Sequence, residues 1–170
     1  MSNGHARVSP PLVALAGWLV PGAGYWLIGQ RARAVIVGVT IVTLFVLGVL
    51  FAGIRVIEVP GWDDAGMLVR VDHLGRRFRR TDSGYSHGRW VLTGGGLIGE
   101  IANKPWYIPQ IVAGPITIVT SALSVKAAQA GVARVHARLM DIGVLYTAIA
   151  GMLNLLVIID SSYRAAHPPE

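Results

Sequence analysis

Four long stretches without Lys, Arg, Asp, Glu or His constrain the fold of this chain more than any other feature. They cover residues 8–30, 34–54, 105–125 and 142–159 and are 23, 21, 21 and 18 residues long. A helix needs about 20 apolar residues to cross roughly 30 Å of hydrocarbon, because it rises about 1.5 Å per residue. The sequence therefore predicts four transmembrane helices.

Composition supports an all-α integral membrane protein. Of the 170 residues 53% are hydrophobic and 14% are charged, and the mean hydropathy is +0.54. An ordinary soluble domain carries more charge than this. The chain has no cysteine, which excludes disulfides, thiolate metal sites and a cysteine nucleophile.

The connections between the four stretches predict three parts. Residues 1–54 form a transmembrane hairpin, residues 55–104 a polar, basic extramembrane lobe, and residues 105–170 a second transmembrane hairpin. Within the lobe, partly alternating residues on either side of a turn favour a short β-hairpin over residues 67–81. Apolar residues at helical spacing predict an amphipathic connector over residues 125–140, with Asp141 as the N-cap of the fourth helix.

The distribution of basic residues predicts the orientation. With four spans, ten Lys and Arg lie on the side of both termini and the lobe, and five lie on the other side. Because cytoplasmic segments carry the excess of Lys and Arg, we expect a multi-pass protein of the cell (inner) membrane with the termini and the lobe in the cytoplasm.

Proline and glycine interrupt the first and third stretches. Pro21, Gly22 and Gly24 lie in the first and Pro115 in the third. Proline removes a backbone donor, and such a break is tolerated in a membrane only where protein or a cavity satisfies the backbone. The favoured interpretation is a packed kink, and the alternative is a half-helix end aimed at a ligand, as in transporters.

The run Pro21-Gly22-Ala23-Gly24-Tyr25-Trp26, followed by a short basic turn at Arg31, resembles the small two-transmembrane-helix (PGxG) domain of many bacterial membrane proteins. The match covers about residues 10–54. The segment from Leu145 to Asp160 looks like the closing helix of an uncharacterised bacterial four-helix membrane family that begins with the same element. This resemblance implies a topology and no known activity.

Small residues recur at helical spacing in the third and fourth stretches and indicate close helix packing. In lipid such faces allow close backbone contact, and an amide adds a hydrogen bond of on the order of 1 kcal/mol. Packing of these two helices against each other is the favoured interpretation, and a homo-oligomer or a partner helix is the alternative. The residues are Gly143, Thr147, Gly151 and Asn154, with Ala113, Thr117 and Ser121.

A basic cluster in the lobe is a candidate contact for anionic lipid headgroups, with an aromatic residue at the interface. A solvated topology signal explains it about as well, and the absence of a known motif argues against nucleic-acid binding. The cluster consists of Arg76, Arg77, Phe78, Arg79 and Arg80.

No catalytic constellation, metal site or cofactor site is apparent, since the five histidines are scattered without the spacing of a zinc site. We therefore expect a non-enzymatic structural, scaffold or accessory protein. The alternative is a component of a small-solute or ion pathway, suggested by the breaks at Pro21 and Pro115. A lipid-acting enzyme is a weaker alternative, and it would use Asp63, Asp64, Asp72 and His73.

Overall fold

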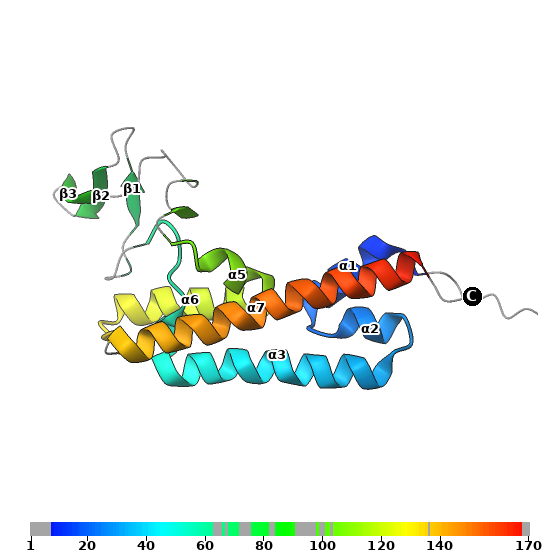
Figure 1. Cartoon of the computed structure of the whole chain (residues 1–170). Coiled ribbons are helices and arrows are strands. Elements are labelled where there is room, and N and C mark those ends of the chain that lie inside the picture. Colours follow the sequence, from blue (N-terminus) through cyan, green and yellow to red (C-terminus); the bar gives the residue numbers. More distant parts are fainter. Residues whose placement is uncertain are drawn as a thin grey trace, which may run out of the picture.

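The computed structural model describes residues 8–62, 66, 68–71, 76–81, 84–90, 98, 101–102, 104–135 and 137–167, and this part of the chain is mostly helical (Figure 1). The helices are α1 (Pro10–Leu19), α2 (Ala23–Leu27), α3 (Arg31–Ala52), the 3₁₀ turn η1 (Ile54–Val56), α5 (Tyr107–Val112), α6 (Pro115–Gln129) and α7 (Ala137–Ala166).

Two of these helices, α3 and α7, are long and apolar enough to cross a membrane, by length and composition. They lie side by side and antiparallel along the length of the molecule (Figure 1). One end of this pair, which we call the lobe end, contains the end of α3 and the start of α7. At the opposite end, the far end, α3 starts and α7 finishes.

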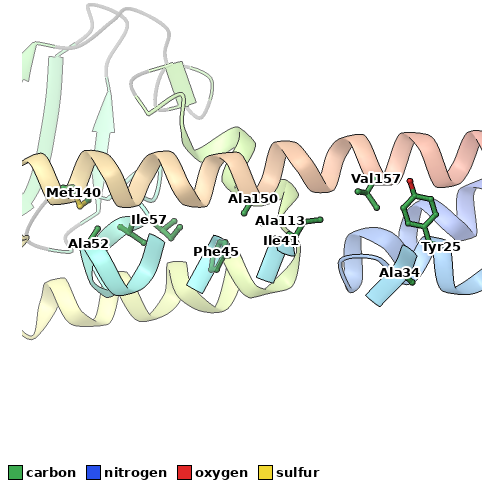
Figure 2. Close-up of a cluster of buried hydrophobic side chains, with 11 residues drawn as sticks. Tyr25, Ala34, Ile41, Phe45, Ala52, Ile57, Ala113, Met140, Ala150 and Val157 are labelled. Atoms are coloured by element: carbon green, nitrogen blue, oxygen red, sulfur yellow. The ribbon is translucent and has the colours of Figure 1, made fainter. Parts of the chain in front are cut away.

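Glycine brings the backbones of α3 and α7 together near the lobe end. A methyl group on Gly143 would overlap Ala52, and one on Gly48 would press against Thr147. From this crossing a row of buried side chains runs along the pair, including Phe45 and Ile41 on α3 (Figure 2). Such close approach is typical of membrane helices that pack through small residues.

The first apolar stretch does not form one helix. Val20, which precedes Pro21, is extended, and proline disfavours a helical residue before it. Gly22 then adopts φ 87°, which reverses the chain into α2. The helices α1 and α2 pack against each other, and Gly24 lies against Val13. The segment thus starts and finishes at the far end (Figure 1).

The third apolar stretch is divided in the same way. Helix α5 ends at Val112, Gly114 adopts φ 104°, and Pro115 opens α6. Because proline lacks a backbone donor and has a fixed φ, it suits the first position of a helix. Helix α6 runs back beside α5, so this segment starts and finishes at the lobe end (Figure 1).

The structure therefore differs from the expected pair of transmembrane hairpins. Each half of the chain consists of a short helical hairpin followed by one long helix, and the two halves run in opposite directions (Figure 1). The first and last described residues lie at the far end, whereas the described part of the lobe lies near the end of α3 and the start of α7. Because residues 8–30 turn back, the first described residues and the described part of the lobe lie at opposite ends of the α3–α7 pair (Figure 1), whereas the sequence predicted the termini and the lobe on one side of a membrane.

The expected amphipathic connector over residues 125–140 is not a single helix. Helix α6 ends at Gln129, residues 130–135 are irregular, and Asp141 lies inside α7 instead of capping it. Contacts with the segment after α3 hold this irregular backbone: Arg55 Nη1 donates to the carbonyl of Val132 at 2.7 Å. These tertiary contacts outweigh the helical pattern of the sequence.

The lobe contains a three-stranded antiparallel sheet in the order β1 (Val69–Val71), β2 (Arg76–Thr81), β3 (Gly84–Trp90). Strands β1 and β2 pair where the sequence favours a hairpin, with Arg70 opposite Phe78. The third strand was not expected. It completes the sheet, because two short strands alone are marginally stable.

Replacing Gly143 with Leu tests the close crossing of α3 and α7. We expect the free energy of unfolding to fall by about 2 kcal/mol, because overpacking a filled interface forces backbone shifts. Circular dichroism during denaturation of the detergent-solubilised protein measures the change. Ile142→Leu, at the neighbouring exposed position, should leave stability unchanged, and equal stability of both variants would contradict the close contact.

Candidate functional site

The reversals of the two hairpins meet halfway along α7. The indole Nε1 of Trp18, near the end of α1, donates to the carbonyl of Ile111, near the end of α5, at 3.2 Å. A methyl group on Gly114 would overlap the carbonyl oxygen of Trp18. The tips of two hairpins that start from opposite ends of the molecule are therefore in direct contact.

Asn154 of α7 lies where these tips meet and is fully buried. Its amide nitrogen donates to the carbonyls of Val112 at 2.9 Å and of Gly17 at 3.2 Å. One side chain thus holds the last turns of α1 and α5 on α7. Its oxygen Oδ1 is buried and has no hydrogen-bond partner among the described residues. Since buried acceptors are normally satisfied, Oδ1 is an exception that calls for a donor from a water or a ligand.

Further buried polar side chains lie between the level of Asn154 and the lobe end. Gln110 of α5 donates through Nε2 to the hydroxyl of Thr147 at 2.8 Å. The hydroxyl of Thr117 on α6 donates to the backbone carbonyl of Gln110 at 2.6 Å. All three side chains are almost fully buried. They tie both arms of the second hairpin to α7.

A pocket of about 460 Å³ lies at the lobe end. The pocket lies between α5, the first turns of α7 and the segment after α3. Gln110, which donates to Thr147, belongs to its wall. The lining residues are Val56, Glu58, Lys104, Trp106, Tyr107, Gln110, Met140, Asp141, Val144 and Leu145.

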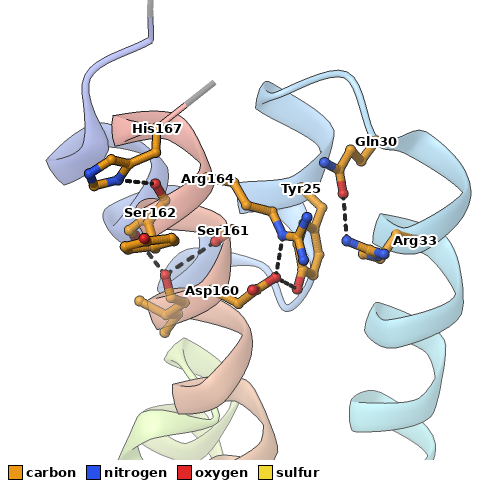
Figure 3. A network of polar contacts seen from close by, with 10 residues as sticks. Tyr25, Gln30, Arg33, Asp160, Ser161, Ser162, Arg164 and His167 are labelled. Atoms are coloured by element: carbon orange, nitrogen blue, oxygen red, sulfur yellow. Dashed lines mark hydrogen bonds and ion pairs between the residues drawn. The ribbon is translucent and has the colours of Figure 1, made fainter. Parts of the chain in front are cut away.

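A second polar cluster lies at the far end (Figure 3). The phenol of Tyr25 donates to the carboxylate of Asp160, and Arg164 Nε donates to the same carboxylate at 2.7 Å. The guanidinium of Arg33 lies 5.5 Å from the centre of the Tyr25 ring. These contacts join α2, α3 and α7, and they fix the first hairpin at its base.

The residues expected to mediate helix packing are buried between helices of this chain. Gly143, Thr147, Gly151 and Asn154 form one buried face of α7, and this face contacts α3, α5 and α1 in turn. Ala113, Thr117 and Ser121 are buried as well. Apart from Ala113, which meets Gly151, these residues lie on α6, which packs mainly against α5 and η1.

Pro21, Gly22 and Pro115 lie at the chain reversals, and Gly24 lies against Ser161 of α7. A packed kink was the favoured interpretation of these residues. In the structure the chain reverses its direction completely in both stretches. Gln110 and Trp18 were not identified from the sequence as residues that form hydrogen bonds between helices. One signal was present for Gln110, because it is the only amide side chain in residues 105–125.

The backbone of the basic cluster Arg76–Arg80 forms part of β2, and its contact with anionic lipid stays a prediction. The candidate catalytic residues Asp63, Asp64, Asp72 and His73 lie outside the described residues. Within the described part of the chain, no group of three or more His, Cys, Asp or Glu could hold a metal ion.

The fold and the contact between the hairpin tips define a helical protein with two candidate membrane spans and two helical hairpins. Residues 12–169 match the family of unknown function DUF6677, and the chain belongs to this family. The match agrees with the expected uncharacterised family and gives no support to the PGxG resemblance. No curated protein and no solved structure matches the chain.

Replacing Asn154 with Leu tests the contact between the hairpin tips. Two backbone carbonyls lose their donor, so we expect a loss of about 1 to 2 kcal/mol in the free energy of unfolding. Denaturation followed by circular dichroism measures this loss. Leu155→Met, at the next and exposed position, serves as the control. An Asn154→Leu protein as stable as this control would show that the bonds do not hold the tips.

Proposed function

We propose that this chain is a membrane protein that provides a pathway for a small polar solute or ion. In this proposal α3 and α7 cross the bilayer, and the two hairpins enter it from opposite faces and turn back at its centre. The observation that carries the proposal is the buried Oδ1 of Asn154, which has no partner among the described residues where the hairpin tips meet.

The outer surface of the long helices supports a membrane location. On α3 the side chains of Ile36, Val39 and Leu50 are 67%, 60% and 71% exposed. On α7 the exposed large apolar residues include Leu156 and Ile159. Contiguous apolar surface of this extent is unfavourable in water and is suited to lipid. The argument therefore rests on exposure as well as on helix length.

Re-entrant hairpins agree with the physics of a bilayer. Non-helical backbone at membrane depth is tolerated only where it is buried in protein or lines a water-filled cavity. Both reversals meet this condition, because each packs against the other and against α7.

The repeated arrangement resembles the way many transporters are built. Such proteins contain repeats of inverted direction, and discontinuous helices meet near the bilayer centre where the substrate binds. Here a hairpin and a long helix occur twice in opposite directions. The free acceptor of Asn154 and the buried hydroxyls of Thr147 and Thr117 would line the route.

Basic residues favour a cytoplasmic lobe end in this topology. Eleven Lys and Arg belong to the lobe and to the connections at the lobe end, against four at the far end. The positive-inside rule then places the lobe in the cytoplasm and both termini on the outer side of the cell (inner) membrane. Arg76–Arg80 would face acidic headgroups of the cytoplasmic leaflet.

An accessory or structural subunit is the second candidate. It is favoured by an outward-facing apolar groove of about 490 Å³ lined by Pro21, Gly22, Gly38, Trp26 and Val42, among others. Small residues in such a groove would admit the side chains of a partner helix or of a second copy. A companion that purifies with the chain at a fixed ratio would favour this candidate.

Flux through liposomes containing the full chain tests the pathway, with K⁺, methylammonium and glycerol as probes. We expect a saturable flux of at least one probe. Asn154→Ser removes the whole amide, both the oxygen without a partner and the nitrogen that bonds to Gly17 and Val112, and should lower that flux at least about tenfold, the effect of losing one interaction of about 1.4 kcal/mol or more.

Thr40→Val removes a polar group from the exposed face of α3 and is the matched control. Circular dichroism establishes that all variants are folded. No flux above empty liposomes for any probe, or equal flux in the Asn154→Ser and Thr40→Val proteins, would contradict the proposed pathway.

A further inference from the structure

We infer that the pocket at the lobe end binds the ammonium group of a small organic cation. This inference deepens the proposed function, because it names the class of solute that would enter the pathway. It rests on the pocket's volume, the state of its charged groups and its aromatic wall. Binding can be measured whether or not transport occurs.

The volume suits a small molecule. About 460 Å³ lies within the range of roughly 300 to 1,000 Å³ typical of ligand pockets. The walls are mainly apolar and aromatic and include a few polar groups. Gln110 belongs to this wall and also donates to the buried hydroxyl of Thr147 on α7.

Two of the three charged side chains in the pocket wall are already engaged. Glu58 forms an ion pair with Arg134 at 2.5 Å. Lys104 donates to the carbonyls of Val59 at 2.8 Å and of Trp62 at 2.5 Å. These contacts fix the segment after α3: Glu58 is paired with an opposite charge, and Lys104 directs donors to two backbone carbonyls.

Asp141 is the charge left for a ligand. It lies in the first turns of α7, is exposed, and has no ion pair or side-chain hydrogen bond among the described residues. Inside α7 its carboxylate caps no helix end. A carboxylate at the edge of a pocket attracts a cation and repels an anion.

Aromatic and sulfur-containing side chains complete the recognition of an ammonium group. Trp106 is 53% exposed, and Tyr107 and Met140 lie beside it in the wall. Alkylated ammonium groups bind to aromatic faces, and the attraction increases when the cation is desolvated. Carboxylate and aromatic groups together favour an organic ammonium ion over a small inorganic cation.

Tetramethylammonium chloride is the probe, and the tryptophan fluorescence of the detergent-solubilised full chain, to which Trp106 contributes, is the readout. We expect a saturable change that an equal concentration of NaCl does not produce. Trp106→Phe should remove the signal. Asp141→Asn should weaken binding about tenfold, as expected for loss of a charge partner worth about 1.4 kcal/mol.

Asp160→Asn removes the same charge from the same helix at the far end and serves as the matched control. We expect it to bind the probe like the unchanged protein. No saturable change, or equal affinity in the Asp141→Asn and Asp160→Asn proteins, would overturn the inference.

An ammonium group can come from a free amine or from the headgroup of phosphatidylethanolamine. Lipid nanodiscs made with and without phosphatidylethanolamine distinguish these sources. Competition by the lipid would assign the pocket to a headgroup, and unchanged affinity would assign it to a free amine. Binding without flux would support the ammonium site and contradict the proposed pathway. Flux without binding would support the pathway and overturn the ammonium site.

Discussion

A backbone that reverses direction in an apolar environment must have its polar groups satisfied by other parts of the protein. In this chain the two reversals meet this requirement together, at Asn154 on α7. Its amide nitrogen bonds to the ends of α1 and α5, and the indole of Trp18 joins the same two helices. The position of each hairpin therefore depends on the other, and both depend on α7.

Helix α7 accordingly organises the whole molecule. Near the lobe end it meets α3 through Gly143, at its middle it meets α5 through Gly151, and near the far end it meets α1 and α2. Three of its polar residues lie at three levels: Asp141 in the pocket, Asn154 at the hairpin tips, and Asp160 in the far cluster. The proposed entrance and the proposed centre of the pathway therefore lie on one rigid element.

The sequence predicted the long helices better than the short ones, for a physical reason. Residues 34–54 carry no internal break, so hydropathy located α3 to within a few residues. Residues 8–30 have enough apolar length to cross a bilayer, and hydropathy does not distinguish crossing from turning back. Proline and glycine indicated a break, but the direction of the chain after it depends on contacts such as that of Gly24 with Ser161.

The candidate site was predictable only in part. The small-residue face of α7 is visible as a spacing in the sequence, whereas its partners come from three other helices and cannot be read from spacing. The pocket combines Glu58, Trp106 and Asp141 from three separated segments. No local pattern links them, because the reversal at Gly114 brings α5 alongside the start of α7.

Accessibility of single cysteines to a membrane-impermeant maleimide tests the central claim most directly, since the chain contains no cysteine of its own. Ser9→Cys, Ala32→Cys and Ala102→Cys replace exposed residues before α1, at the start of α3 and before α5. Two re-entrant hairpins predict that positions 9 and 32 are labelled from one side of the membrane and position 102 from the other. Labelling of positions 9 and 102 from one side, with position 32 on the other, would show four crossings and contradict this account.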